Sequence, residues 1–133
     1  MIGLGTDSAA SNNSLDLFTQ MRNVALLQKH KEYDALQCSA QEVLDMATIN
    51  GARVSGLEDK IGSVEVGKQA DFTFLNSNDY NLQPLSKERI ISHLVYSANA
   101  GNVTDTMVAG EFIKLDKDHI NELVKEAVYE LGV

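Results

Sequence analysis

Asp7 has the clearest chemical potential in this sequence. It follows a short apolar run, residues 2–6, and precedes a loop of small and polar residues, 8–13. Acidic residues at the C-terminal end of a barrel strand lie where such folds carry out chemistry. A carboxylate in that place can bind Zn²⁺ or Fe²⁺, or take a proton from a metal-bound water. The alternative is a loop aspartate that caps the next turn, and the residues alone leave both roles open.

The other reactive residue types are isolated from one another. His30, His93 and His119 form no H-x-H pattern and no pair at i and i+4, and structural or surface roles are expected for each. Cys38 has no sequence neighbour that would lower its thiol pKa, so we expect a packing residue and not a nucleophile. A catalytic metal needs about three protein ligands. We therefore expect that Asp7 alone holds a metal weakly or not at all.

The stretch GLGTDS is a weak candidate for a phosphate-binding turn. Gly3 and Gly5 supply the first two glycines of G-x-G-x-x-G, but the third position is Ser8. The stretch also lacks the lysine of a P-loop. Nucleotide binding is therefore not favoured.

Composition limits the classes of partner and compartment. The chain has 133 residues, 44% of them hydrophobic, which is a one-domain length with enough apolar residues for a core. Its net charge of −8 argues against nucleic acid and against an anionic membrane surface. The single cysteine rules out an internal disulfide and indicates a reducing compartment. Without a basic and apolar leader or a long apolar run, we expect a cytoplasmic chain that does not enter membranes.

The elements that must position Asp7 begin with a short buried strand, predicted at residues 2–6. A strand cannot satisfy its own backbone groups, so this one needs distant partners or lacks its natural neighbours. Asn12 or Asn13 can cap a first helix that ends near His30. Its apolar side is spaced close to the helical period; it comprises Leu15, Phe18, Met21, Ala25 and Leu26.

A second helix is predicted from Ser39. Ser39 and Glu42 form a capping box, in which each side chain satisfies the other residue's backbone N–H. Gly51 suits the left-handed position that ends a helix. The apolar stripe of this helix consists of Val43, Leu44 and Ala47.

Glycine and β-branched residues dominate the chain after residue 55, which favours strands and turns. We predict a tight turn at 64–68 and a strand at 71–75. A third helix follows Pro84, with Ile90, Ile91, Leu94 and Val95 on its apolar side. Alternating residues predict a hairpin at 105–115, turning at Ala109 and Gly110. Asp116 can cap a last helix, whose apolar positions are Ile120, Leu123, Val124, Ala127, Val128 and Leu131.

With these residues in view, the sequence resembles the C-terminal part of the metal-dependent amidohydrolases. Within them it is similar to the deaminase/chlorohydrolase group, which includes the methylthioadenosine/S-adenosylhomocysteine deaminases. The stretches that carry the resemblance follow one another in the family's order. They are GLGTDSAASNNSLDLFTQMRNVALLQK, SAQEVLDMATINGARVSGLEDKIGSVEVGKQADFTFLN and ISHLVYSANAGNVTDTMVAGEFIKL.

The resemblance implies an α+β chain, the C-terminal portion of a (β/α)₈ barrel with part of a small β-sandwich. Residues 1–55 would form the end of the barrel, with its last strand and helices. Residues 56–115 would form strands, a hairpin and an intervening helix of the small β-domain, and residues 116–133 a C-terminal helix. Asp7 matches the family's aspartate at the end of strand eight, which binds the metal and moves a proton between the hydrolytic water and the leaving amine.

The resemblance also implies the activity of a longer parent. That parent would be a hydrolase acting on non-peptide C–N bonds, using Zn (or Fe) to deaminate a purine or related heterocycle as its small-molecule substrate. This sequence lacks the family's H-x-H, its later metal-binding histidines and its proton-handling glutamate, and a barrel takes roughly 250 residues. We therefore expect a fragment that is inactive and metal-free when isolated. The alternative is a non-catalytic folding or protein-interaction module.

A fragment of this kind would leave apolar surface uncovered. The helices predicted at 14–30 and 40–50 would have packed on a sheet that is not present in this chain. Their exposed side chains would then favour either a homo-oligomer formed through exposed barrel surfaces or repacking of the helices on one another and on the strands. The side chains concerned include Leu15, Phe18, Val43 and Leu44.

Overall fold

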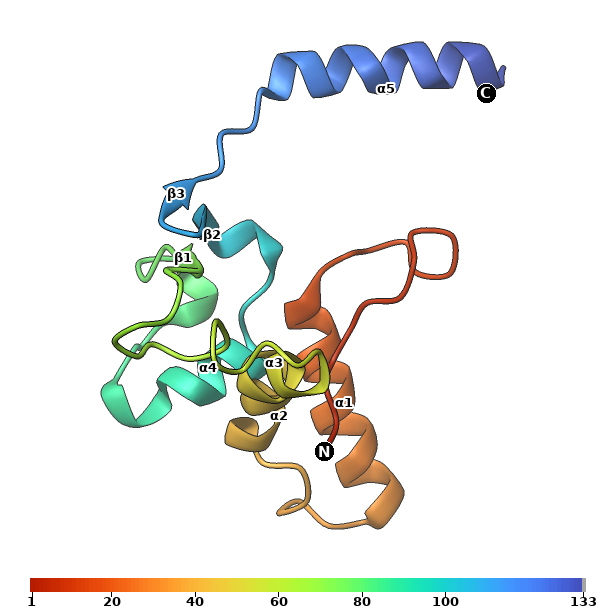
Figure 1. The fold of residues 1–133 in the computed structure, drawn as a ribbon. Helices are drawn as coiled ribbons and strands as arrows, with labels where there is room; N and C mark the ends of the chain where they lie inside the picture. The colour runs from red at the N-terminus through yellow and green to blue at the C-terminus, as the bar shows by residue number, and fades with distance from the viewer. Residues whose placement is uncertain (133) are drawn as a thin grey trace.

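Helices and a small antiparallel sheet form separate layers, and one further helix projects away from both (Figure 1). The structure, a computed structural model, describes residues 1–132. The α-helices are α1 Leu17–Glu32, α2 Ala40–Ala47, α3 Ile49–Val54, α4 Ile90–Tyr96 and α5 Lys117–Leu131. The strands are β1 Phe72–Leu75, β2 Val103–Val108 and β3 Glu111–Phe112, and 3₁₀ turns lie at Tyr80–Leu82, Lys87–Arg89 and Ala100–Asn102. Within residues 1–132, no helix has both the length and the apolar character needed to cross a membrane.

The core lies where α1, α2 and α4 pack against one another. Met21 and Ala25 come from α1, Val43 from α2 and Val95 from α4, and all are buried in one cluster. Phe18 and Leu44 pack against the same cluster. Helix packing thus covers most of the apolar positions that we predicted on the first two helices.

That packing shows which of the side chains expected to be uncovered are covered within the chain itself. Val43 is fully buried, and Phe18 and Leu44 are half-buried against the core, so these residues do not provide the exposed surface considered for an oligomer. Leu15 precedes α1 and is 64% exposed, and Leu26, on the outer side of α1, is also exposed. The prediction of one continuous apolar side from Leu15 to Leu26 is therefore wrong at both ends.

The capping residues at the N-termini of α1 and α2 show where each helix begins. The capping box is confirmed: the Ser39 hydroxyl accepts the Glu42 N–H at 3.3 Å, and the Glu42 carboxylate accepts the Ser39 N–H at 2.7 Å. The cap of α1 is Asp16, which accepts the Phe18 N–H at 2.9 Å, and not Asn12 or Asn13. The Asn12 side chain is engaged inside the preceding loop, so the helix begins later than predicted.

The end of α2 also differs from the prediction. The helix stops at Ala47, and Gly51 lies inside the short helix α3 instead of ending α2. The chain near Gly3 crosses α3 at Gly51. A Cβ atom added at Gly3 would lie 3.1 Å from the Gly51 Cα, a tighter contact than usual, so this crossing favours glycine at position 3.

The sheet has the order β1-β2-β3 with antiparallel pairs throughout. Phe72 of β1 lies opposite Met107 of β2, and Val108 lies opposite Glu111 of β3. The predicted hairpin is confirmed. Its turn residues Ala109 and Gly110 have φ values of 51° and 85°, the positive values that a two-residue type I′ turn requires.

The strand predicted at residues 2–6 is wrong. No strand is present there, and Leu4 instead donates its backbone N–H to the Met46 carbonyl of α2 at 2.9 Å. The sheet within the described residues consists of β1 to β3 and does not include this segment. A single extended segment without a neighbouring strand cannot build a ladder, which accounts for the difference.

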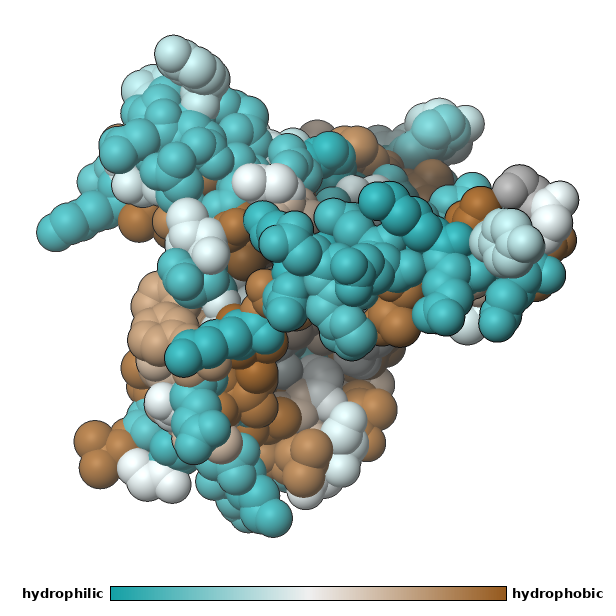
Figure 2. Space-filling view, turned by 90° about the horizontal axis from the view of Figure 1, so that it is seen from above, coloured by the Kyte–Doolittle hydropathy of each residue, from teal (hydrophilic) through white to brown (hydrophobic). Residues whose placement is uncertain are grey.

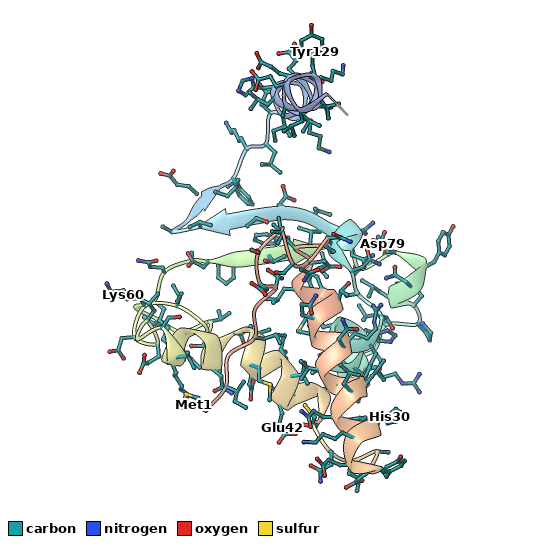
Figure 3. All side chains as sticks on the ribbon, turned by 90° about the vertical axis from the view of Figure 1, so that its right-hand side faces the viewer. Met1, His30, Glu42, Lys60, Asp79 and Tyr129 are labelled. Atoms are coloured by element: carbon teal, nitrogen blue, oxygen red, sulfur yellow. The ribbon has the colours of Figure 1, made fainter. Side chains whose placement is uncertain are left out.

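Helix α5 begins where predicted, because Asp116 accepts the His119 N–H at 3.0 Å. The predicted C-terminal segment, 116–133, extends one residue beyond the described part. The helix lies apart from the other layers, with Tyr129 pointing away from the molecule (Figure 3). Seen from above, α5 crosses the front as a largely hydrophilic band, with hydrophobic surface visible on the layers beneath (Figure 2). The apolar positions of α5 are nevertheless exposed; they are Ile120, Leu123, Val124, Val128 and Leu131.

A buried amide joins the helical layer to the sheet. Asn102, only 4% exposed, donates to the Asp79 carboxylate at 2.6 Å and to the Asn81 side chain at 3.0 Å. Its oxygen accepts the Asn99 N–H at 2.9 Å, and its carbonyl accepts the Asn76 N–H at 2.8 Å. The loop after β1 is thus held against the start of β2, and the sequence analysis did not single out this residue.

Replacing Asn102 with alanine should destabilise the chain strongly. The change removes the side-chain hydrogen bonds of a buried residue to Asp79, Asn81 and Asn99, each of which contributes about 0.5–1.5 kcal/mol. Urea denaturation followed by circular dichroism measures the loss. Asn78→Ala is the matched control, because only its backbone N–H takes part in the hydrogen bonding of this loop, and it should stay within about 0.5 kcal/mol of the parent. Equal stability of the two variants would contradict this role of Asn102.

Candidate functional site

Asp7 lies in an ordered loop that leads into α1. Its φ is +62°, a left-handed value that aspartate adopts more readily than most residues. Its carboxylate accepts the N–H of Ser8 at 2.7 Å. The Ser8 carbonyl accepts the N–H groups of Ser11 and Asn12, and the Asn12 side chain donates to the Thr6 carbonyl at 2.7 Å. Local hydrogen bonds therefore fix the shape of the loop around the carboxylate.

The loop favours the charged form of the Asp7 carboxyl. The backbone N–H of Ser8, and secondly the side chain of Ser11, lower the pKa of this carboxyl from its ordinary value. The side chain is exposed. The local role that we left open, an acceptor for the next turn, is realised here. An exposed carboxylate with a lowered pKa is also a suitable ligand for a hard cation, so the two roles are compatible.

The surroundings of Asp7 supply only part of a metal site. Within residues 1–132, no group of three or more His, Cys, Asp or Glu side chains is placed to hold a metal ion. His30 lies at the end of α1 remote from the sheet (Figure 3). One carboxylate is short of the roughly three ligands that a zinc site needs. These residues fit one coordination position, not a complete centre.

Cys38 has the packing role expected for it. It is half-buried against the core cluster of the helices. Burial, and then the charge of Glu42, raise the pKa of its thiol, while Lys29 acts in the opposite direction. The Lys29 ammonium donates to the Cys38 carbonyl at 2.8 Å. A thiol with a raised pKa is mostly protonated at neutral pH, which makes it a poor nucleophile.

The far end of the Asp7 loop is anchored by contacts that the sequence did not reveal. The Asp16 carboxylate accepts the Thr19 hydroxyl at 2.9 Å and the Ala100 N–H at 3.3 Å. The Arg22 guanidinium, one turn into α1, donates to the Ala98 carbonyl at 2.8 Å. The only sequence signal was local, an aspartate followed three residues later by threonine. The partners lie more than 70 residues away and carry no motif.

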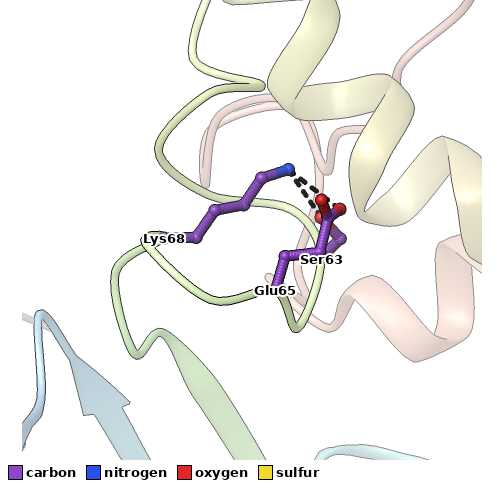
Figure 4. Close-up of polar contacts among 3 residues, drawn as sticks. All are labelled: Ser63, Glu65 and Lys68. Atoms are coloured by element: carbon purple, nitrogen blue, oxygen red, sulfur yellow. Dashed lines mark hydrogen bonds and ion pairs between the residues drawn. The ribbon is translucent and has the colours of Figure 1, made fainter.

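A second polar cluster stabilises the turn predicted at 64–68. The Lys68 N–H donates to the Glu65 carbonyl at 3.2 Å, which confirms the turn. The Lys68 ammonium, whose side chain is 13% exposed, donates to the Ser63 hydroxyl at 2.6 Å and lies 3.3 Å from the Glu65 carboxylate (Figure 4). The Ser63 hydroxyl in turn donates to Glu65. The Ser63 hydroxyl and then Lys68 lower the pKa of the Glu65 carboxyl. The arrangement closes a turn. The carboxylate that accepts the Ser63 hydroxyl is paired with Lys68, so it is a poor base for activating Ser63 as a nucleophile.

Known deaminases are similar to this chain in both sequence and fold. It is 40% identical to the 5′-deoxyadenosine deaminase of Methanobrevibacter smithii, over 98% of this chain and 31% of the relative. It is 45% identical to the 5-methylthioadenosine/S-adenosylhomocysteine deaminase of Teredinibacter turnerae, over 88% of this chain and 26% of the relative. A crystal structure of an adenosine deaminase from Xanthomonas campestris with bound zinc superposes with a TM-score of 0.86 and 37% identity, over 93% of this chain and 29% of that one.

The isolated 133-residue chain should not bind zinc tightly at Asp7. A single carboxylate cannot provide the coordination of a stable site. Titration calorimetry with Zn²⁺ at neutral pH should give weak binding or none, and Asp7→Asn and Asp34→Asn should behave like the parent. Asp34 is the matched control, because its carboxylate also accepts a nearby backbone N–H, that of Leu36 at 2.8 Å. Stoichiometric, sub-micromolar binding that only Asp7→Asn removes would show that ligands have been missed.

Family membership rests on most of the chain. The sequence model of the amidohydrolase family matches residues 1–113, which contain Asp7, the helical core and the whole sheet. The chain spans about 30% of the length of the curated relatives it matches. Its mixed helix and strand structure corresponds to a C-terminal portion of the amidohydrolase fold, as the resemblance implied. The chain belongs to the amidohydrolase family.

Proposed function

We propose that this chain is the C-terminal part of a zinc-dependent deaminase that removes the amino group of adenosine-like nucleosides by hydrolysis. The observation that carries the proposal is similarity to named deaminases over nearly the whole chain, at 40% identity over 98% of its residues in one case. The structural neighbour with bound zinc is also an adenosine deaminase. The small-molecule substrate, the rest of a (β/α)₈ barrel and a cytoplasmic location belong to the same proposal.

Asp7 is the residue through which this chain would take part in the chemistry. Bound zinc would supply an activated water for attack on the carbon that carries the amino group. Asp7 would occupy one coordination position, and its carboxylate would move a proton between that water and the leaving amine. Support comes from its exposure, its ordered loop and the lowered pKa of its carboxyl. The other ligands would come from parts of the relatives' length that this chain does not span.

The proposed division of the chain into segments follows the fold of the amidohydrolase family. Residues 1–55 would belong to the barrel, 56–115 to the small β-domain and 116–133 to a terminal helix. Helix α4 lies within the middle segment but packs against α1 and α2. The middle segment would therefore contribute to the joint between barrel and sheet as well as to the sheet itself.

A chimeric enzyme tests the proposed function. In it, this chain replaces the matching C-terminal portion of the 5′-deoxyadenosine deaminase from Methanobrevibacter smithii, a relative that matches 98% of its residues. The chimera should release ammonia from 5′-deoxyadenosine in a zinc-dependent reaction. Asp7→Asn should lower kcat at least about a hundredfold, the usual contribution of a proton-transferring residue. A coupled ammonia assay measures both rates.

Asp34→Asn in the same chimera is the control, and it should leave kcat within about twofold of the parent chimera, because Asp34 lies outside the proposed site and asparagine keeps a side-chain oxygen for the Leu36 N–H. A folded chimera without activity would contradict the deaminase proposal and favour a non-catalytic interaction module. Full activity in Asp7→Asn would retain the family assignment but contradict the role of Asp7. The isolated chain should show no ammonia release above the blank.

We further propose that the isolated chain self-associates. The apolar positions of α5 remain exposed in the monomer, including Leu123 and Val128, and burial of one such side chain contributes roughly 1.5–3 kcal/mol. Light scattering during size-exclusion chromatography should therefore show an oligomer, and Leu123→Lys should shift it toward the monomer. Tyr129→Lys is the matched control, because Tyr129 is 88% exposed on the opposite side of α5 and its loss should leave the mass unchanged. A monomeric parent chain would contradict self-association.

A further inference from the structure

A cavity lies between the helical layer and the sheet, and nothing in the proposed deaminase chemistry uses it. Its volume is about 340 Å³. Helices α1, α2 and α4 and strand β1 all contribute to it, as expected from the position of the helices directly below the sheet (Figure 3). Apolar side chains form most of its lining, among them Leu17, Phe18, Leu44, Phe72 and Leu75. Cavities of roughly 300–1,000 Å³ with mostly apolar walls are typical of small-molecule sites.

A small number of polar groups also line this cavity. Asp71, an exposed residue just before β1, accepts the Ala109 N–H through one carboxylate oxygen at 2.7 Å. Thr48 and Thr73 also line it, and the Thr48 hydroxyl donates to the Leu44 carbonyl at 2.7 Å. A few polar groups on apolar walls are what fixes the orientation of a bound small molecule.

The charge of the lining selects the class of ligand. Among the described residues that line the cavity, Asp71 is the charged one, and none is a lysine, arginine or histidine. The whole chain carries a net charge of −8, which attracts cations and repels anions. A ligand with an apolar body and a positive head complements both the walls and the carboxylate.

We propose that this cavity binds a small organic cation, an aryl or alkyl ammonium whose apolar part enters between α1, α2 and β1 and whose charged head pairs with Asp71. The volume, at the low end of the usual range, limits the apolar part to about one ring. No residue of the Asp7 loop lines the cavity, so the site is separate from the proposed metal ligand. The proposal does not depend on the deaminase assignment.

The test compares a cation with its neutral analogue on the isotope-labelled 133-residue chain. Titration with 2-phenylethylammonium, followed by amide chemical shifts in β1 and α2, should give a Kd at least about tenfold lower than titration with 2-phenylethanol. Asp71→Asn should bring the two Kd values within about twofold of each other. This variant retains a side-chain oxygen for the Ala109 N–H and should keep the hairpin contact. Glu111→Gln, on β3 outside the cavity lining, should leave the tenfold preference unchanged.

A second variant tests the cavity itself. Ala47→Leu adds side-chain volume at the cavity wall and should weaken both ligands at least about tenfold. Equal Kd values for cation and alcohol in the parent chain would overturn the proposal. So would shifts unaffected by Ala47→Leu, or the absence of any shift at ligand concentrations on the order of 10 mM.

Discussion

The arrangement of this chain depends on the hydrogen bonds that the buried side chain of Asn102 makes. Its amide joins the loop after β1, through Asp79 and Asn81, to the start of β2. Asn81 also donates to the Ser97 carbonyl at the end of α4, which extends the network to the helical layer. A buried polar group without a partner costs free energy, so each member holds the others in place. This network therefore connects the sheet to the helices, so the two layers do not form independent folds.

Contacts beside this joint anchor one end of the loop that carries the proposed metal ligand. The chain segment after α4 offers the Ala98 carbonyl to Arg22 and the Ala100 N–H to Asp16. Asp16 caps α1, and the Asp7 loop ends at that cap. On its other side the loop is tied to α2 by the bond from Leu4 to Met46. Contacts between segments that are far apart in the sequence therefore anchor the Asp7 loop, while the nearby Ser8 and Ser11 lower the pKa of the Asp7 carboxyl.

Features contained within a few residues could be predicted from the sequence. The capping box at Ser39, the turn at Ala109 and Gly110 and the cap at Asp116 all need only neighbours to form. The predicted strand at residues 2–6 failed because a strand needs partners, and no local pattern supplies them. Asn102 was missed for a related reason: a polar residue among small ones is typical of a loop until its distant partners are known.

The central claim is that Asp7 supplies one ligand to a deaminase metal centre completed by other segments. A crystal structure of the chimeric enzyme grown with zinc, with anomalous diffraction recorded at the zinc absorption edge, tests it most directly. We predict a zinc peak with an Asp7 carboxylate oxygen about 2.0–2.2 Å from it. A fully coordinated zinc ion elsewhere, with the Asp7 carboxylate still bonded only to the Ser8 N–H, would contradict the account.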